Sequence, residues 1–362
     1  MARTEADRCP GVLAVHQAAD GGLARVRVPG GRLTCSQLDV LRVAAADLGD
    51  GRLELTSRGN VQLRALKAAG PPELSQRLFA AGLLPSLAHE RVRNILVSPL
   101  SGLDGQSAYD VLPVATALDQ ALCGRPELAE LPGRFLFALD DGRGDLADVR
   151  ADVAVRALDD RTALLVVGTR AVQVEWTDVP DLMLAVADAF LAVRDQEWRI
   201  AEVPDGEQLI LNRLGLAADE VVPMTATRLT AGVHGAALVV TVPLGSLTQE
   251  QAGALSQVGS EVRVTPWRSV VVPANSAGLE DVGLVTTPDS VWEGVTACAG
   301  QPGCAKALAD VRGDAARLLP QLTRRGRRVH LSGCERRCGK PTGDSVDVLA
   351  VPDGYLVNGE RL

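Results

Sequence analysis

The sequence predicts an α+β protein that contains two copies of the same pair of structural units. A strand-helix-strand pattern over residues 22–66 returns near residue 235, and each copy is followed by a longer α/β segment. The two copies differ in their cysteines, because four of the seven lie between residues 298 and 338. A chain of 362 residues is long enough for two or three domains.

The first unit is a strand, a helix and a strand. "LARVRVPGG" alternates apolar and polar residues, "LTCSQLDVLRVAAADLG" has helical spacing after a Thr34 cap, and "RLELTSRGNVQLRAL" alternates again. The second copy repeats its turn, cap and helix start, since Val28-Pro29, Leu33-Thr34 and Gln37 correspond to Val242-Pro243, Leu247-Thr248 and Gln251. We therefore expect two ferredoxin-like half-domains, over residues 1–75 and 222–278.

Each half-domain precedes a segment with two buried strands and a helix. In the first, over residues 85–215, "RVRNILVSPLSGLDG" leads through "LPGRFLFALDDGRGD" and "TALLVVGTRAVQVEW" to a helix near residues 180–194. In the second, over residues 280–362, "EGVTACAGQPGCAKALADV" leads through "RRVHLSGCERRCGKPTGD" to "VDVLAVPDGYLVNG". No low-complexity linker separates these segments, so we expect them to pack into one body.

Composition restricts the partners. A formal net charge of -8 is unfavourable for nucleic acid, and no stretch approaches the roughly 18 apolar residues of a membrane span. We expect a cytoplasmic protein that binds neither nucleic acid nor a membrane.

An odd number of cysteines argues against a disulfide framework, and Cys9, Cys35 and Cys123 are interpreted as packing residues.

The other four cysteines form two pairs, Cys298-x5-Cys304 and Cys334-x3-Cys338. Each pair follows an apolar strand in a glycine-containing loop, and four thiolates from two loops are the ligand set of a [4Fe-4S] cluster. Structural zinc is the alternative, although pairs of its ligands are usually two to four residues apart. The sequence therefore favours an iron–sulfur cluster.

Arginines at strand ends suggest an anionic ligand. Arg58, Arg93 and Arg134 each stand beside a predicted strand, while Arg336, Arg337 and Lys340 flank the second cysteine pair. Guanidinium groups donate paired hydrogen bonds to carboxylates and keep their charge, although arginines at strand ends are also common as solvated surface residues. A ligand with several carboxylates would use a group of them.

These motifs resemble those of the nitrite/sulfite reductase family, whose duplicated fold carries a [4Fe-4S] cluster coupled to siroheme. The matching stretches are "LTSRGNVQL", "RNILVSPLSGLD", "LPGRFLF", "TACAGQPGC" and "LSGCERRCG". The resemblance implies cluster ligation by all four paired cysteines, with Cys338 in the place of the cysteine that bridges to siroheme iron. It also implies that Arg58, Asn60, Gln62 and Arg93 face the tetrapyrrole.

Within this family the opening "CPGVLAVHQAADGGLARVRVPGGRLT" is similar to that of the precorrin-3B synthases, oxygen-dependent enzymes of aerobic cobalamin biosynthesis. Sulfite reductases carry two lysines where this chain has Arg134 and Leu136, so a proton-donating group is missing. The resemblance then implies hydroxylation of precorrin-3A by O2 with formation of a γ-lactone. A siroheme-dependent sulfite or nitrite reductase is the alternative.

The synthase interpretation implies further components. Electrons would reach the cluster from NADH through a separate reductase or ferredoxin, because the chain lacks a convincing dinucleotide-binding motif. Oxygen activation would use a mononuclear non-haem iron, for which His16, His89, His234 and His330 offer no helical ligand spacing. His330 is the best placed of them but fits a buried strand histidine better. The sequence identifies no general acid or base.

Overall fold

Two antiparallel sheets exchange a strand with each other. The computed structural model describes residues 9–221, 224–227, 229–322, 326–341 and 343–362, so parts of the predicted units 1–75, 222–278 and 280–362 lie outside the described residues. The first sheet has the order β1-β2-β5-β4-β14 and the second the order β12-β13-β16-β15-β3. Because β3 belongs to the first half of the chain and β14 to the second, each half completes the sheet of the other.

The two halves have equivalent elements. The first contains β1 (His16–Ala18), β2 (Gly21–Val26), η1 (Pro29–Gly31), β3 (Arg32–Thr34), α1 (Cys35–Leu48), β4 (Leu53–Leu55), β5 (Val61–Leu66) and α2 (Gly70–Ala80). The second contains β12 (Gly232–His234), β13 (Ala237–Thr241), β14 (Ser246–Leu247), α6 (Gln249–Leu255), β15 (Glu261–Val264) and β16 (Ser269–Pro273).

Helices α1 and α6 begin with the same local structure. Thr34 accepts a hydrogen bond from the Gln37 backbone N–H, and the Gln37 side chain in turn accepts one from the Thr34 backbone. Thr248 and Gln251 form the same capping box at the start of α6. The sequence correspondence between these residues is therefore confirmed in three dimensions. Buried residues of both halves, such as Leu41 and Leu255, share one hydrophobic core.

The two longer segments form a second pair of repeats. The first contains β6 (Ile95–Val97), α3 (Leu112–Cys123), η2 (Pro126–Glu130), β7 (Phe137–Asp140), β8 (Val153–Ala157), β9 (Thr162–Val167), β10 (Arg170–Glu175), η3 (Trp176–Asp178), α4 (Val179–Val193), η4 (Ile200–Glu202), α5 (Gly206–Leu214) and β11 (Asp219–Glu220). The second contains β17 (Val295–Ala297), α7 (Val311–Leu318), η5 (Leu319–Gln321), β18 (Arg328–Ser332), β19 (Ser345–Val351), β20 (Gly354–Val357) and β21 (Glu360–Arg361).

Their sheets share one topology. Strands β6, β7 and β8 are parallel and β9 and β10 then turn antiparallel, just as β17, β18 and β19 are parallel and β20 and β21 antiparallel. Each repeat has its own hydrophobic core. The predicted α+β fold with two half-domains and two α/β repeats is thereby confirmed.

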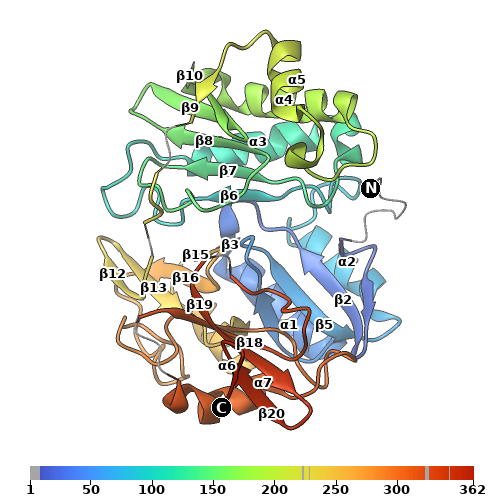
Figure 1. The fold of residues 1–362 in the computed structure, drawn as a ribbon, viewed down its shortest axis with the longest axis vertical. Helices are drawn as coiled ribbons and strands as arrows, with labels where there is room; N and C mark the ends of the chain where they lie inside the picture. Colours follow the sequence, from blue (N-terminus) through green and yellow to red (C-terminus); the bar gives the residue numbers. More distant parts are fainter. Residues whose placement is uncertain (1–8, 222–223, 228, 323–325, 342) are drawn as a thin grey trace.

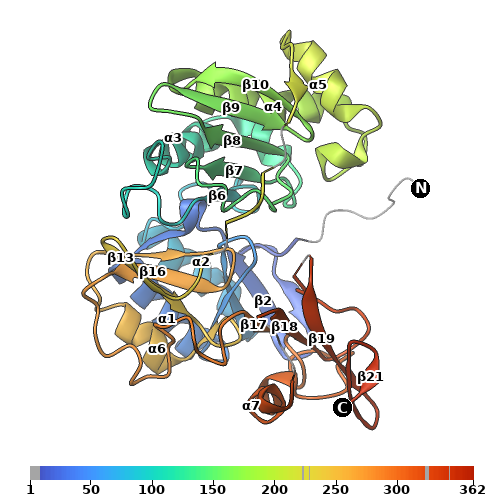
Figure 2. The same ribbon diagram turned by 60° about the vertical axis from the view of Figure 1, so that its left-hand side comes forward.

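Figures 1 and 2 show how the repeats sit on the shared half-domains. The first repeat, in green, covers one side of the two halves, and the second, in red, lies against the first half near β2. Among the described residues, no helix has both the length and the apolar character that a bilayer crossing requires.

Candidate functional site

The four paired cysteines lie at one edge of the second repeat. Cys298 directly follows β17, and Cys334 follows β18 by two residues. Because β17 and β18 are parallel neighbours, their carboxyl ends meet and bring the two cysteine loops together. All four thiols are free of disulfide bonds.

The chemistry of this donor set fits a multinuclear cluster. Burial raises the pKa of the Cys338 thiol, and Cys298, Cys334 and Cys304 add to that rise while Arg336 opposes it. In the described part of the chain, however, no three His, Cys, Asp or Glu side chains are close enough to hold one metal ion. Four cysteine thiolates are the donor set of a [4Fe-4S] cluster, in which each thiolate binds a different iron, so the residues present fit that group.

The loops around the cysteines are held by hydrogen bonds. The Gly333 N–H donates to Cys298 Sγ over 3.1 Å, a contact of the kind that tunes cluster sulfurs. Arg64 donates to the Gly303 carbonyl over 2.6 Å while its guanidinium is paired with Asp20. These contacts fix the loop between Cys298 and Cys304 against the first half-domain.

A second arginine extends this connection toward the first sheet. Arg312, on α7, donates from Nε to the Cys298 carbonyl over 3.1 Å and from Nη1 to Glu54 Oε1 over 2.5 Å. Glu54 is buried on β4 and its other oxygen accepts from Gln62, which accepts from Arg25 in turn. A continuous hydrogen-bonded path therefore joins the cysteine loop to Arg25.

His330 is a structural histidine and not a free metal ligand. Its Nδ1 lies 2.8 Å from the Thr296 hydroxyl and its Nε2 lies 3.2 Å from the Cys338 carbonyl. Burial, with the nearby Arg268 charge, lowers the pKa of His330 to about 4. A neutral imidazole that donates from Nε2 and accepts at Nδ1 satisfies both contacts, so the interpretation as a buried strand histidine fits the geometry.

The cations beside the second cysteine pair have different partners. Arg337 is paired with Asp347 over 2.7 Å and with Glu335 over 3.0 Å, and Lys340 also reaches Asp347. Arg336 is exposed, and its charge opposes the rise in the Cys338 pKa. Of the two arginines predicted to bind ligand in this loop, Arg337 is therefore engaged in ion pairs, while Arg336 lies beside the cysteines.

Three arginines form a positive cluster on the first half-domain. Burial lowers the pKa of Arg27 to about 9, and the neighbouring positive charge of Arg25 lowers it further. Burial lowers the pKa of Arg58 to about 10, and the positive charge of Arg199 is the second cause. Burial also lowers the pKa of Arg25. Since a guanidinium keeps its proton under physiological conditions, these shifts indicate electrostatic strain that a bound anion would relieve.

Arg27 is the most exceptional member of the cluster. It is 2% exposed, its Nε donates to the Arg91 carbonyl, and its Nη1 and Nη2 have no hydrogen-bond partner among the residues that the structure describes. A buried charged group without partners is costly in a protein interior. An anionic ligand at this cluster would supply the missing acceptors.

Sequence comparisons agree with this arrangement. Residues 16–81 match the nitrite/sulfite reductase ferredoxin-like half domain. The chain is 29% identical to a precorrin-3B synthase from a Sinorhizobium species, over 97% of this chain and 82% of that protein. It is 27% identical to a ferredoxin–nitrite reductase from Synechococcus elongatus, over 93% and 78%. This chain therefore resembles nitrite/sulfite reductases and a precorrin-3B synthase, and the two relatives named here each align with more than nine-tenths of it.

The same fold occurs in a solved structure. The structure of the Mycobacterium tuberculosis NirA protein superposes with a TM-score of 0.74 at 20% identity, over 93% of this chain and 73% of that chain. Nearly the whole chain therefore shares the fold of that structure.

The remaining residues predicted from the superfamily motifs have defined positions. Asn60 is buried, where its Oδ1 accepts from the Val28 N–H and its Nδ2 donates to Asn94, so it supports the loop that carries Arg58. Gln62 connects Arg25 to Glu54. Arg134 is exposed and stacks on Trp198, with its guanidinium carbon 4.7 Å from the ring centroid.

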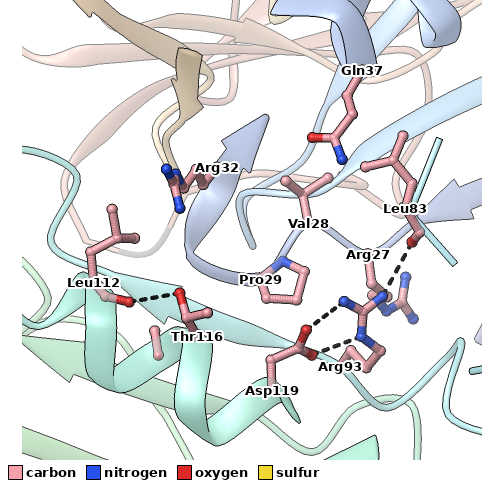
Figure 3. Close-up of a pocket in the computed structure, with 12 residues that line it drawn as sticks. Arg27, Val28, Pro29, Arg32, Gln37, Leu83, Arg93, Leu112, Thr116 and Asp119 are labelled. Atoms are coloured by element: carbon pink, nitrogen blue, oxygen red, sulfur yellow. Dashed lines mark hydrogen bonds and ion pairs between the residues drawn. The ribbon is translucent and has the colours of Figure 1, made fainter. Parts of the chain in front are cut away.

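Arg93, which the superfamily motif implied to face the tetrapyrrole, is paired with a carboxylate in this structure. Its Nε and Nη2 form a bidentate pair with Asp119 at 2.7 and 2.6 Å, and its Nη1 donates to the Leu83 carbonyl (Figure 3). The pair lines a small pocket between η1 and α3. The Arg93 donors are therefore engaged within the protein, and its contact with a ligand stays a prediction.

Sequence reasoning missed several members of the positive cluster. Arg25 and Arg27 were not singled out, although two arginines two residues apart in extended backbone share one face. Cys9, interpreted as a packing residue, lies near Arg25, Arg27 and Arg58 and opposes the lowering of their pKa values. The Gly11 carbonyl accepts from the Arg25 N–H, and the Glu90 carboxylate accepts from the Val12 N–H, which holds this segment beside the cluster.

Proposed function

We propose that this protein is an oxidoreductase of the precorrin-3B synthase type. The observation that carries the proposal is that Arg27 Nη1 and Nη2 lack hydrogen-bond partners among the described residues. Arg27 lies in a cluster with Arg25 and Arg58, and hydrogen bonds link Arg25 to a loop of the cysteine quartet. The 29% identity to a precorrin-3B synthase over 97% of the chain supports it. The substrate would be precorrin-3A, a tetrapyrrole with several carboxylates.

The arginines would bind and orient the substrate. Guanidinium forks donate two parallel hydrogen bonds to each acetate or propionate group, and the buried cluster makes those bonds stronger than they would be in water. Arg27 and Arg58 would contact carboxylates directly, with Gln62 holding Arg25 in place. Arg134 and Arg336, at more exposed positions, would contact carboxylates at the edge of the ligand.

Cys298, Cys304, Cys334 and Cys338 would hold the [4Fe-4S] cluster, which supplies one-electron transfer when bound. The overall reaction places one atom of O2 on the substrate at C20, releases the other as water with two electrons from NADH through a separate reductase or ferredoxin, and forms a γ-lactone with the ring A acetate at C1. A mononuclear non-haem iron would activate oxygen. We propose no ligands for it, because both nitrogens of His330 are engaged.

Reduction of sulfite or nitrite on siroheme is the competing function, since the nitrite reductase from Synechococcus elongatus is 27% identical to this chain. Leu136 argues against it. This side chain is 4% exposed in an apolar cluster, so the position offers no proton donor to a bound oxyanion.

Anaerobic purification followed by iron, acid-labile sulfide and tetrapyrrole analysis separates the two functions. We expect about four sulfides, four or five irons and no siroheme. Incubation with precorrin-3A, ¹⁸O2 and a reductant should then place one labelled atom on the product. Stoichiometric siroheme together with sulfite or nitrite turnover would instead establish a reductase.

Matched arginine variants connect the activity to the proposed site. Arg58→Gln should lower kcat/KM for precorrin-3A at least tenfold, the size expected for a lost charge-assisted hydrogen bond. Arg77→Gln is the control, because Arg77 pairs with Asp47 and Glu73 on the outside of the first half-domain. Equal losses in both variants would contradict the assignment.

A further inference from the structure

Arg268 adopts a backbone conformation that normally requires glycine. The loop Thr265–Ser269 in the second half-domain is equivalent to Thr56–Asn60 in the first, because each threonine hydroxyl accepts from the N–H groups two and four residues later. In this correspondence Arg268 occupies the position of Gly59. Both residues have a φ of 62°, in the left-handed region.

The first half-domain therefore uses glycine where the second uses arginine. A side chain with a β-carbon is strained at this φ, and such strain persists mainly where a functional site requires it. The comparison within one chain shows that the loop can be built without the strain. The arginine at this position therefore needs an explanation other than the loop fold.

Two glycines make room for the Arg268 side chain. A β-carbon at Gly245 would lie 2.4 Å from Arg268 Cδ, and one at Gly339 would lie 2.8 Å from Arg268 Nη2. Neither position tolerates a larger residue without displacement of Arg268. The Nη2 group donates to the Gly339 carbonyl over 3.3 Å, which places the guanidinium beside the turn that follows Cys338.

The charge of Arg268 is directed to this turn rather than to a carboxylate. Among the described residues, its side chain forms no ion pair, whereas Arg337 and Lys340 in the same region are both neutralised by Asp347. Burial, together with the neighbouring Arg312, lowers the pKa of Arg268, and Glu54 opposes this effect. Arg268 is therefore a fixed positive charge whose compensating anion is not supplied by a paired carboxylate.

We propose that Arg268 is a positioning residue of the cysteine centre, which holds the Cys338–Gly339 turn and supplies a positive charge to the [4Fe-4S] cluster bound there. This inference rests on the cluster in the proposed function and not on the identity of the substrate. The cluster gains one negative charge when it takes an electron from the donor, with no bond formed or broken. A nearby cation stabilises that reduced state and so raises the midpoint potential.

The test is an EPR-monitored redox titration of the holoprotein with dithionite. Arg268→Gln and Arg268→Gly should retain four irons and four sulfides, and their midpoint potential should shift to lower values. Arg268→Lys keeps the charge and should stay closer to the parent protein. Arg337→Gln is the matched control, because Arg337 is adjacent to Cys338 but is paired with Asp347, so its removal should shift the potential less.

Arg268→Gly also separates electrostatics from folding. Glycine relieves the strain at φ 62°, so this variant should unfold at the same or a higher temperature than the parent while its potential falls. Unchanged potentials in Arg268→Gln and Arg268→Gly, or a shift no larger than that of Arg337→Gln, would overturn the inference. A protein that binds no cluster would overturn it together with the proposed function. A shifted potential without precorrin-3A turnover would contradict the proposed function alone.

Discussion

Ser98 and Cys298 occupy the same position in the two α/β repeats. Ser98 directly follows β6, and Cys298 directly follows β17, which are the first parallel strands of the two sheets. Five residues separate Ser98 from Asp104, and five residues separate Cys298 from Cys304. The duplication therefore places a cysteine in one copy and a serine hydroxyl in the other.

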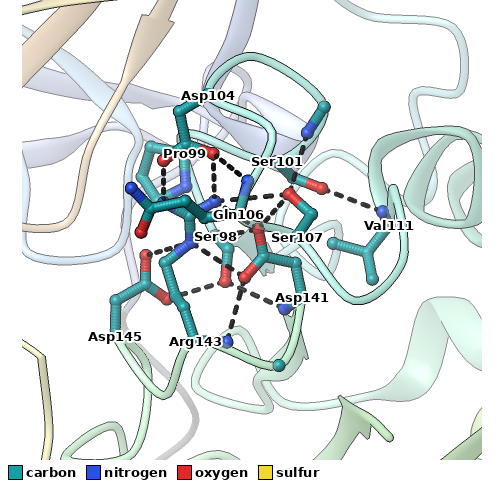
Figure 4. A network of polar contacts seen from close by, with 12 residues as sticks. Ser98, Pro99, Ser101, Asp104, Gln106, Ser107, Val111, Asp141, Arg143 and Asp145 are labelled. Atoms are coloured by element: carbon teal, nitrogen blue, oxygen red, sulfur yellow. Dashed lines mark hydrogen bonds and ion pairs between the residues drawn. The ribbon is translucent and has the colours of Figure 1, made fainter. Parts of the chain in front are cut away.

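A network of ion pairs replaces the cysteines in the first repeat (Figure 4). The Arg143 guanidinium binds Asp104 with distances of 2.7 and 3.0 Å and Asp141 with distances of 2.7 and 2.9 Å. The Ser98 hydroxyl donates to Asp145 over 2.7 Å. The two strand ends that thiolates and metal would join in the second repeat are joined here by charged side chains.

This difference predicts that metal loss affects the repeats unequally. Cys304→Ser should reduce bound iron and sulfide to well below four each and destabilise the second repeat, because the metal contributes folding free energy there. The first repeat should keep its hydrogen-exchange protection, since Arg143 and its partners need no metal. Hydrogen-exchange mass spectrometry with iron analysis measures both effects.

Cys123→Ser is the control for this experiment. Cys123 lies at the end of α3 in the first repeat, away from the cysteine quartet. It should retain the full iron content. Equal iron loss in both variants, or loss of protection throughout the chain in Cys304→Ser, would show that the quartet is not a separate metal centre.

The buried network also predicts a pH dependence of stability. Burial raises the pKa of Asp145 from 3.8 to about 7, with Asp140 and Asp141 adding to the rise and Ser98 and Arg143 opposing it. Because the folded state binds this proton more tightly, the contribution of Asp145 to the free energy of unfolding is largest below pH 4. It is lost as the pH rises to about 7.

Asp145→Asn removes this titration. The free energy of unfolding of the variant, relative to the parent protein, should therefore increase by about 2 kcal/mol between pH 5 and pH 8. Urea unfolding at several pH values measures the difference. Asp159→Asn is a suitable reference, since Asp159 is exposed. A difference between Asp145→Asn and the parent that does not change with pH would contradict the raised pKa.

Arg27 and Arg93 should respond oppositely to the same substitution. Arg27→Gln removes a buried charge without a hydrogen-bond partner on either Nη atom, so it should preserve or increase stability. It should weaken binding of uroporphyrin, a stable tetrapyrrole with eight carboxylates, about tenfold. Arg93→Gln leaves Asp119 unpaired and should cost about 3 kcal/mol of stability.

Fluorescence quenching of uroporphyrin and thermal unfolding provide the two measurements. Binding to the parent protein should weaken with salt, as expected for contacts between charges. If Arg27→Gln destabilises the protein and leaves uroporphyrin binding unchanged, the cluster is structural and the proposed anion site is wrong.

Local patterns in the sequence were sufficient to predict the duplicated fold. The capping residues Thr34 and Thr248 act within one helical turn, and alternation marks β2 and β5 directly, so both signals can be read from adjacent residues. The exchange of β3 and β14 could not be predicted in this way. Each of these short strands pairs with a partner about two hundred residues away, and no local pattern records which copy it joins.

The candidate site was predictable only where spacing carries the information. The cysteine pairs stand out by spacing, whereas the significance of an arginine depends on its partners in space. Arg93 and Arg337 have carboxylate partners in Asp119 and Asp347, while Arg27 has none on its terminal nitrogens. These three residues look alike in the sequence, and only the fold distinguishes them.

The path from the cysteines to the arginine cluster depends on Glu54. Glu54 accepts from Arg312, which holds the Cys298 carbonyl, and from Gln62, which holds Arg25. Glu54→Gln keeps the shape but removes the charge that pairs with Arg312 and accepts from Gln62. We expect weaker uroporphyrin binding, by about threefold to tenfold, because Arg25 loses its fixed orientation. We also expect a changed EPR signal of the cluster, since the Cys298 loop loses its anchor.

Glu261→Gln is the matched control for Glu54→Gln. Glu261 pairs with Arg32 and Arg263 on the second half-domain and makes no recorded contact with the cysteine loops among the described residues. If Glu54 connects the two sites, only Glu54→Gln changes both the uroporphyrin affinity and the EPR spectrum. A change in one property without the other would show that Glu54 supports a single site, and the hydrogen-bonded path would then carry no coupling between them.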